Sequence, residues 1–121
     1  MDIVISVKNE KPIYEQVYDQ IASQIISGAL EANCCLPSIR TVAKELGISI
    51  ITVKSAWEML ENNNFIYTRA GKGCFVTEYA KKHLEDKKFA IAGDKLTKDI
   101  SYYKNLGLTL NELMELIKKE Y

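Results

Sequence analysis

The fold of this chain is decided by residues 36–76, which read LPSIRTVAKELGISIITVKSAWEMLENNNFIYTRAGKGCFV. In the first part of this segment the apolar residues recur at spacings of three and four, which predicts two short amphipathic helices around a turn at Gly47. Ser38 and Ser49 precede the two helices and are the expected N-caps, because a serine hydroxyl can accept a hydrogen bond from a free backbone N–H. The expected inward-facing residues are Ile39, Val42, Ala43, Leu46, Val53, Ala56, Trp57 and Leu60.

The second part of the segment predicts a β-hairpin. Three asparagines at residues 62–64 are a stop signal for the preceding helix. Residues 65–69 and 74–77 are rich in β-prone side chains, and residues 70–73 form a glycine-bearing turn between them. Helix, tight turn, helix and hairpin in this order predict a winged helix-turn-helix.

The residues before this segment predict one more helix. Residues 3–5 are a short β-prone run, and Pro12 suits the first turn of a helix that ends at Gly28, a predicted C-cap. Residues 29–36 are predicted to form a loop. We assign residues 1–78 to the winged helix-turn-helix domain. The inward stripe of its first helix is Ile13, Val17, Ile21 and Ile25.

The remaining residues, 79–121, predict a two-helix tail. A helix is expected over residues 79–105, and Asn105-Leu106-Gly107-Leu108 is a break. Thr109 and Glu112 have the spacing of a capping box, which marks the start of a second helix. The fold class is therefore mainly α with a small β-hairpin (α+β). The two apolar stripes of the tail are Phe89, Ala92, Leu96, Ile100 and Tyr103, then Leu110, Leu113, Met114 and Ile117.

Composition narrows the function. The 121 residues carry no net charge, but residues 40–72 hold five cations and three carboxylates, which suits moderate, salt-sensitive binding to a polyanion. No apolar run is long enough to span a membrane and no signal peptide is recognisable, so we expect a cytoplasmic protein with no membrane partner.

Catalytic and cofactor chemistry find little support. With His83 as the single histidine, neither a metal site nor a catalytic triad is expected, and we predict no enzyme activity and no cofactor. Cys34, Cys35 and Cys74 show neither zinc spacing nor a disulfide framework; reduced thiols are favoured, and a thiol sensor is left open.

Double-stranded DNA is the expected partner. An α-helix fits the major groove, where side chains near its N-terminal end read base edges. Hydroxyl groups there can bond phosphate or bases, a lysine can reach phosphate or guanine, and isoleucines can contact thymine methyl groups. The candidate readers are Ser49, Ile50, Ile51, Thr52, Lys54 and Ser55.

A second group of residues is expected to contact the DNA backbone. Ser38 and Arg40 are the candidates at the start of their helix, where Arg40, in the first turn, can clamp phosphate beside the free helix N–H groups. The cations of the hairpin can reach the backbone or the minor groove, and its glycines permit a close approach. These hairpin candidates are Arg69, Gly71, Lys72 and Gly73.

At these residues the sequence resembles the GntR family of bacterial transcription regulators. The resemblance is carried by PIYEQV at residues 12–17, SGAL at 27–30, LPSIR at 36–40, LGIS at 46–49, Thr52-Val53 and RAGKGCFV at 69–76. The short tail resembles the YtrA-like subfamily, in which a small C-terminal region joins two protomers. The resemblance implies a repressor that binds a palindromic operator as a homodimer through residues 79–121.

Two features depart from the family pattern. The family commonly has a basic or polar residue after the serine that starts the recognition helix, whereas this chain has Ile50 and Ile51. An alternative interpretation is therefore a winged-helix protein-interaction module in which these isoleucines dock a protein groove. The loop before Leu36 carries Cys34 and Cys35 in place of the usual Pro-Gly and charged residues. Whether a small-molecule effector binds is left open.

Overall fold

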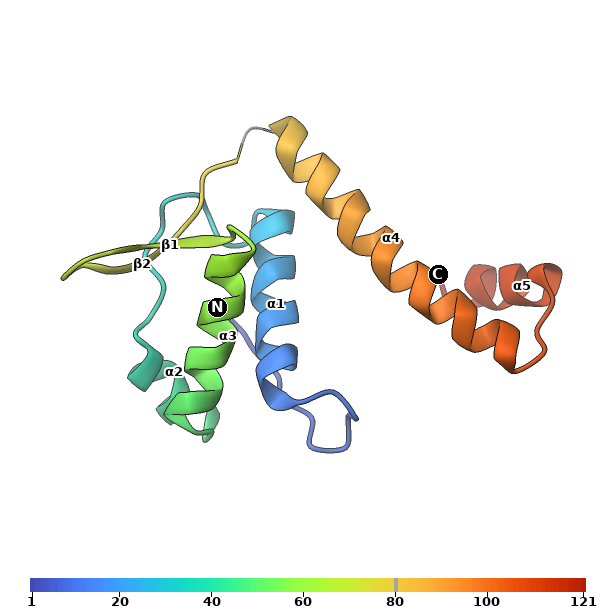
Figure 1. Cartoon of the computed structure of the whole chain (residues 1–121), viewed down its shortest axis with the longest axis horizontal. Helices are drawn as coiled ribbons and strands as arrows, with labels where there is room; N and C mark the ends of the chain where they lie inside the picture. The colour runs from blue at the N-terminus through green and yellow to red at the C-terminus, as the bar shows by residue number, and fades with distance from the viewer. Residues whose placement is uncertain (80) are drawn as a thin grey trace. The chain divides into compact units, whose positions relative to one another are not determined.

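A computed structural model describes residues 1–79 and 81–121, and for Lys81 and Lys82 it describes the backbone only. The chain divides into two compact units, Met1–Ala80 and Lys81–Tyr121. Figure 1 shows the order of the elements along the chain. The first unit contains α1 (Ile13–Ser27), α2 (Ile39–Leu46), α3 (Ile50–Asn62), β1 (Ile66–Arg69) and β2 (Gly73–Val76). The second unit contains α4 (Lys81–Asn105) and α5 (Leu110–Glu120).

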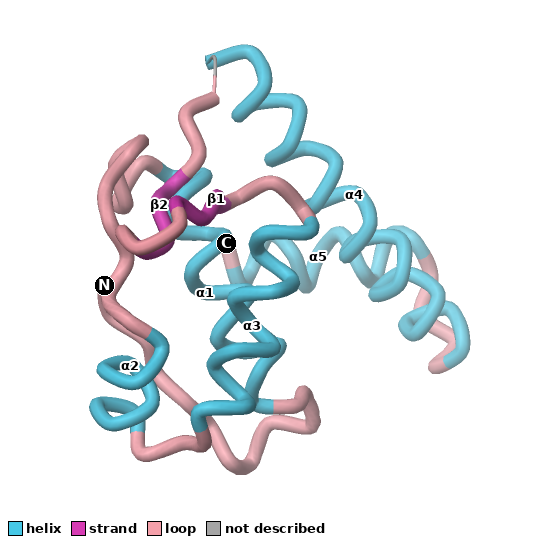
Figure 2. Tube along the Cα trace, turned by 60° about the vertical axis from the view of Figure 1, so that its left-hand side comes forward, coloured by secondary structure: helices cyan, strands magenta, loops and turns pink. Residues whose placement is uncertain are grey.

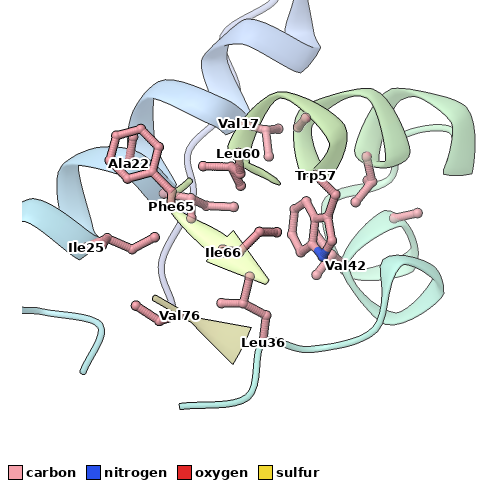
Figure 3. Packing of buried hydrophobic residues seen from close by; sticks show 14 residues of the cluster. Val17, Ala22, Ile25, Leu36, Val42, Trp57, Leu60, Phe65, Ile66 and Val76 are labelled. Carbon is pink, nitrogen blue, oxygen red and sulfur yellow. The ribbon is translucent and has the colours of Figure 1, made fainter. Parts of the chain in front are cut away.

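The core of the first unit lies between α1, α2, α3 and the hairpin (Figure 3). Helix α3 packs against α1, α2 and β1, and the tube in Figure 2 shows α1 and α3 next to each other. The predicted buried stripe of α3 is confirmed, because Val53 and Leu60 are 0% exposed and Trp57 is 4% exposed. Truncating a fully buried leucine such as Leu60 to alanine typically costs about 2–5 kcal/mol. At the edge of this core, and only partly buried, lie the predicted inward residues Ile13, Ile39 and Leu46, together with Ile48 of the turn.

The turn between α2 and α3 is closed by Gly47, as predicted. Gly47 has φ 66° and ψ 35°, the left-handed conformation that a residue with a Cβ rarely adopts. Its N–H donates to Lys44 O at 3.4 Å, and the N–H of Ile48 donates to Ala43 O at 3.0 Å. This Schellman pattern satisfies the last carbonyls of α2 and turns Ile48 back onto the core.

The hairpin is antiparallel and pairs Tyr67 with Phe75 and Arg69 with Gly73. Its strands begin and end within a residue of the predicted positions, and Gly73 belongs to β2 instead of the turn. The predicted loop at residues 29–36 is confirmed except for one isolated bridge, in which Cys35 pairs antiparallel with Phe75 of β2. The N–H of Val76 donates to Cys34 O at 2.9 Å, and the N–H of Leu36 donates to Cys74 O at 2.8 Å. This pairing ties the hairpin to the segment that enters α2.

The β-prone run at residues 3–5 forms no strand, and glutamine side chains of α1 bind it instead. Gln20 exchanges two hydrogen bonds with the backbone of Val4, at 2.8 and 2.7 Å. Gln16 exchanges two with the backbone of Ser6, at 2.9 and 3.0 Å. Four residues of helix rise about 6 Å and two residues of extended chain about 6.6 Å, so the two periods match. The glutamines thus supply the partners that a neighbouring strand would have supplied.

The second unit contains two helices, and the side chains that the structure describes in it form no buried core. The predicted break is confirmed at Gly107, which has φ 84°, and the predicted capping box is confirmed by hydrogen bonds of 3.2 and 2.9 Å between Thr109 and Glu112. The helix expected over residues 79–105 includes Ala80, which lies outside the described residues. None of the side chains of residues 83–121 is fully buried.

Among the described residues, no helix is both long enough and apolar enough to cross a membrane.

Candidate nucleic-acid interface

Helix α3 is capped by Ser49, as predicted. Ser49 Oγ accepts a hydrogen bond of 3.1 Å from the N–H of Thr52 and lies 2.7 Å from Thr52 Oγ1. The hydroxyls of Ser49 and Thr52 are therefore hydrogen-bonded to each other. This bond uses one of their two O–H groups, and the other can still donate to an external acceptor. The next two side chains, Ile50 and Ile51, are 45% and 76% exposed. The tip of α3 therefore presents mainly aliphatic groups.

Helix α2 starts with the same arrangement. Ser38 Oγ accepts a hydrogen bond of 3.1 Å from the N–H of Thr41 and donates one of 2.8 Å to Thr41 Oγ1. Two of the predicted DNA contacts, Ser38 and Ser49, thus already have a structural role in the protein without DNA, because each caps the start of a helix. Sequence reasoning did not include Thr41, although the spacing of a serine three residues before a threonine occurs at the start of both helices.

The outer face of α3 continues from Ile51 through Lys54 and Ser55 to Glu58, at helical spacings of three and four. Lys54 and Glu58 are exposed and Ser55 is half-buried. Glu58 was not among the predicted site residues, but a carboxylate at this position can accept a hydrogen bond from the cytosine amino group. The signal that could have found it is its place one turn beyond Lys54 on the same face.

Four of the predicted DNA contacts come together at the junction between α2 and the hairpin. Ser38, Arg40, Lys72 and Gly73 line one hollow of about 490 Å³, in which Cys35 also takes part. Among the described residues neither Arg40 nor Lys72 forms an ion pair, so both cations are available to an external anion. The structure therefore brings two cations from distant parts of the sequence to one side of the hairpin turn.

The hairpin presents an aromatic pair that sequence reasoning missed. The rings of Tyr67 and Phe75 are stacked, with centroids 5.6 Å apart and planes at 22°. The guanidinium carbon of Arg69 lies 5.9 Å from each ring centroid. Tyr67 Oη donates a hydrogen bond of 2.9 Å to Asn33 Oδ1, which connects this pair to the loop before α2. The pairing of residues 67 and 75 could be inferred only from a correct hairpin register.

The hairpin needs glycine at two positions, one in the turn and one at the start of β2. Gly71 has φ 73° and Gly73 has φ 109°, both in the region that favours glycine. A Cβ on Gly73 would lie 3.7 Å from Cys35 Sγ, an ordinary contact, so its backbone conformation and not crowding is the constraint. Cys34, Cys35 and Cys74 are free thiols, and the described residues contain no cluster of three side chains able to hold a metal ion.

The fold and these surfaces define a class: a winged helix-turn-helix protein with an exposed recognition helix and a cationic hairpin. Residues 13–76 match the family described as bacterial regulatory proteins, gntR family. The chain therefore belongs to the GntR family of DNA-binding transcription regulators. Its relatives are named as transcriptional regulators and repressors and not as enzymes.

Three known proteins illustrate the similarity. The HTH-type transcriptional repressor YtrA of Bacillus subtilis is 31% identical, over 97% of this chain and 90% of the relative. A Listeria monocytogenes crystal structure described as a transcriptional antiterminator has 32% identity and a TM-score of 0.80, covering 99% of this chain and 90% of that one. The AraR(DBD), solved in complex with operator ORE1, has 25% identity and a TM-score of 0.54, covering 64% of this chain and 94% of that one.

Proposed function

We propose that this protein is a transcriptional repressor that binds a palindromic operator as a homodimer, joined through residues 79–121. In each protomer, the domain of residues 1–78 would bind one half-site of the operator. Helix α3 would lie in the major groove and the hairpin would contact the flanking DNA backbone. The observation that carries the DNA contact is the hollow shared by Arg40 and Lys72 at the start of α2, because neither cation forms an ion pair with any residue that the structure describes. The similarity to the AraR(DBD), which was solved with an operator, supports the same use of this fold.

The start of α2 favours a phosphate at this hollow. The first N–H groups of a helix have no partner within the helix and carry a partial positive charge. In α2 the Ser38 hydroxyl satisfies only the N–H of Thr41. A phosphate oxygen near Arg40 can accept from the remaining N–H groups and pair with the guanidinium at the same time. We propose Arg40 as the phosphate clamp and Lys72 as its counterpart on the hairpin.

The proposed dimer rests on the exposed apolar residues of the second unit. A two-helix segment without a core cannot offset the conformational entropy lost on folding. In this unit Leu110 is 72% exposed, Leu116 46% and Ile117 47%. Helices α4 and α5 line an apolar cleft of about 380 Å³, with Leu96, Ile100, Tyr103, Leu113, Leu116 and Ile117 on its walls. A second copy of this unit would cover these side chains in both protomers at once.

The DNA half of the proposal is tested by selection from a random DNA library with the full chain. We expect enrichment of an inverted repeat, because a two-fold symmetric dimer presents two equal recognition helices. Fluorescence anisotropy on the enriched duplex should then show affinity that falls steeply as salt is raised. Enrichment of a single, non-repeated motif would contradict the palindrome while leaving DNA binding intact.

The dimer half is tested by sedimentation equilibrium of Ile117→Glu. A carboxylate placed in the apolar cleft would be desolvated without a partner in the dimer, so we expect a shift to monomer. Lys119→Glu is the matched control, since it puts the same side chain two residues further along α5 at an exposed polar position. Dimers of unchanged stability in Ile117→Glu would contradict the assignment of α5 to the interface.

The repressor assignment is tested with a reporter gene placed behind the selected operator. We expect transcription to fall when the full chain is produced in the same cells and to recover with Arg40→Ala. A rise in transcription would identify an activator.

A further inference from the structure

We propose that Ile50 and Ile51 read thymine methyl groups in the major groove, so that each operator half-site contains thymines where the tip of α3 enters. This inference rests on the proposed function, because it requires that the chain bind an operator through α3. It goes further by stating which chemical group of the DNA the first turn of this helix recognises.

The first step is the position of the two residues. Ile50 and Ile51 are the first two residues of α3, directly after the cap Ser49. They are 45% and 76% exposed, whereas the buried stripe of the same helix starts only at Val53. The core of the first unit does not include either of them. Their side chains are therefore available at the end of the helix that base reading uses.

The second step is that polar base reading is weak in this turn. The side chains of Ser49 and Thr52 are hydrogen-bonded to each other at 2.7 Å, and Ser49 Oγ also accepts from the N–H of Thr52. The hydroxyls are thus held by the cap, and the side chains that project freely beside them are hydrocarbon. The exposed surface of this turn is therefore mainly apolar, and an apolar group of the DNA is its best match.

The third step is the chemistry of the groove. The C5 methyl of thymine is the apolar group that base pairs present in the major groove, and apolar side chains contact it there. Isoleucine has one strongly preferred χ1 rotamer in a helix, so its methyl groups are held in place before binding. Consecutive helical residues point about 100° apart, so Ile50 and Ile51 are expected to contact methyls of different bases.

The charge around the two isoleucines favours DNA over a protein groove as the occupant. Lys54 lies one turn further along α3, at spacings of four and three from Ile50 and Ile51, and its side chain is exposed. Among the described residues Lys54 forms no ion pair. In DNA, a thymine methyl lies near the phosphates of the backbone. The isoleucines can contact the methyl group while Lys54 reaches a phosphate.

The test compares thymine with uracil in the selected operator. Deoxyuridine keeps every hydrogen-bonding group of thymine and removes only the methyl, so the comparison isolates the apolar contact. Anisotropy with the full chain should show about fourfold weaker binding for each contacted thymine that is replaced, the value expected for losing one buried methyl. Replacing thymines that lie outside the part of each half-site contacted by the tip of α3 should leave the affinity unchanged.

Variants of the protein complete the cycle. With Ile51→Ala the operator should bind more weakly, and uracil replacement at the matching position should have no further effect, because the same contact is already lost. Ile51→Val keeps a branched side chain and should retain most of the uracil effect. Val7→Ala is the control, since Val7 is an exposed aliphatic residue of the same unit and 87% exposed.

The outcomes separate this inference from the proposed function. An operator that is bound equally with thymine and uracil would overturn the inference and leave the proposed function in place. A loss of affinity in Ile51→Ala with no dependence on the methyl would also overturn it, as would unchanged affinity in Ile51→Ala, which would direct attention to a protein partner. Failure of the selection to enrich any sequence would refute the operator proposal itself.

Discussion

The guanidinium carbon of Arg69 lies 5.9 Å from the centroid of the Tyr67 ring, and the phenol of Tyr67 is anchored by a 2.9 Å hydrogen bond to Asn33. The flexible arginine thereby rests on a stacked aromatic pair that the loop before α2 holds in place. Cation–π contacts at exposed sites contribute about 0.5–1 kcal/mol. The hairpin therefore presents an arginine that is partly ordered before it meets DNA.

Tyr67→Ala is predicted to weaken operator binding about two- to fivefold, because the ordering of Arg69 must then be supplied during binding. The slope of log affinity against log salt should not change, since no charge is removed. Arg69→Ala should instead lower the magnitude of that slope by about one. Tyr67→Phe, which keeps the ring and loses only the bond to Asn33, is the intermediate control. Equal slopes for Arg69→Ala and the unmodified chain would contradict a phosphate contact.

Arg40→Ala is predicted to weaken binding to operator and unrelated DNA by the same factor, because phosphate contacts carry no sequence information. The magnitude of the salt slope should fall by about one. The matched variant Arg40→Lys keeps the charge and should retain the slope while losing the paired hydrogen bonds of the guanidinium. A change in sequence preference in the Arg40→Ala library selection would assign this residue to base reading instead.

Ser49→Ala is predicted to destabilise the protein by about 1 kcal/mol, the usual cost of losing an N-cap. Urea denaturation followed by the fluorescence of Trp57, which is buried in α3, measures this change. Ser49→Asp should restore the cap and the stability, but its carboxylate would face phosphate and weaken DNA binding. If Ser49→Ala is as stable as the unmodified chain, the cap seen at Thr52 contributes nothing to folding.

The capping box of α5 predicts a pH dependence within the second unit. Backbone and side-chain hydrogen bonds from Thr109 lower the pKa of Glu112 from its ordinary value of 4.5. Because the pKa of the folded state is lowered, the cap stabilises α5 above pH 4.5 and is lost as pH falls through the lowered value. No change is expected near neutral pH.

The matched variant Glu112→Gln keeps an acceptor for the N–H of Thr109 and removes the titration. Helix content by circular dichroism, measured from pH 7 downward, should therefore diverge between the two proteins only in the acidic range. Superimposable profiles would contradict a role for the Glu112 carboxylate in the cap.

Several parts of the fold were predictable because their causes are local. The stripe of Val53, Trp57 and Leu60 follows from helical spacing, and the cap at Ser49 and the turn at Gly47 follow from the conformational preferences of those residues. The break at Gly107 and the capping box that follows it have the same origin. Predictions of this kind need only residues within one or two helical turns.

Other features escaped prediction because they join residues far apart in the sequence. Gln20 of α1 binds the backbone of Val4, 16 positions away in the sequence. The pairing of residues 34–36 with β2 and the bond from Tyr67 to Asn33, 34 positions away, likewise depend on how the chain returns to itself. Neither period nor composition marks such contacts.

The sequence by itself determined the helices, their caps and the hairpin, because short-range periodicity and turn chemistry specify them. It also identified the family, through the motifs that the chain shares with other GntR regulators. Only the tertiary structure decided that Arg40 and Lys72 share one hollow, that Arg69 rests on Tyr67 and Phe75, and that no side chain of residues 83–121 is fully buried. The physical reason is that packing of the whole chain decides which distant side chains meet and which side chains stay exposed. Their positions depend on the register of a hairpin and on the surface left uncovered, neither of which is a property of any one segment.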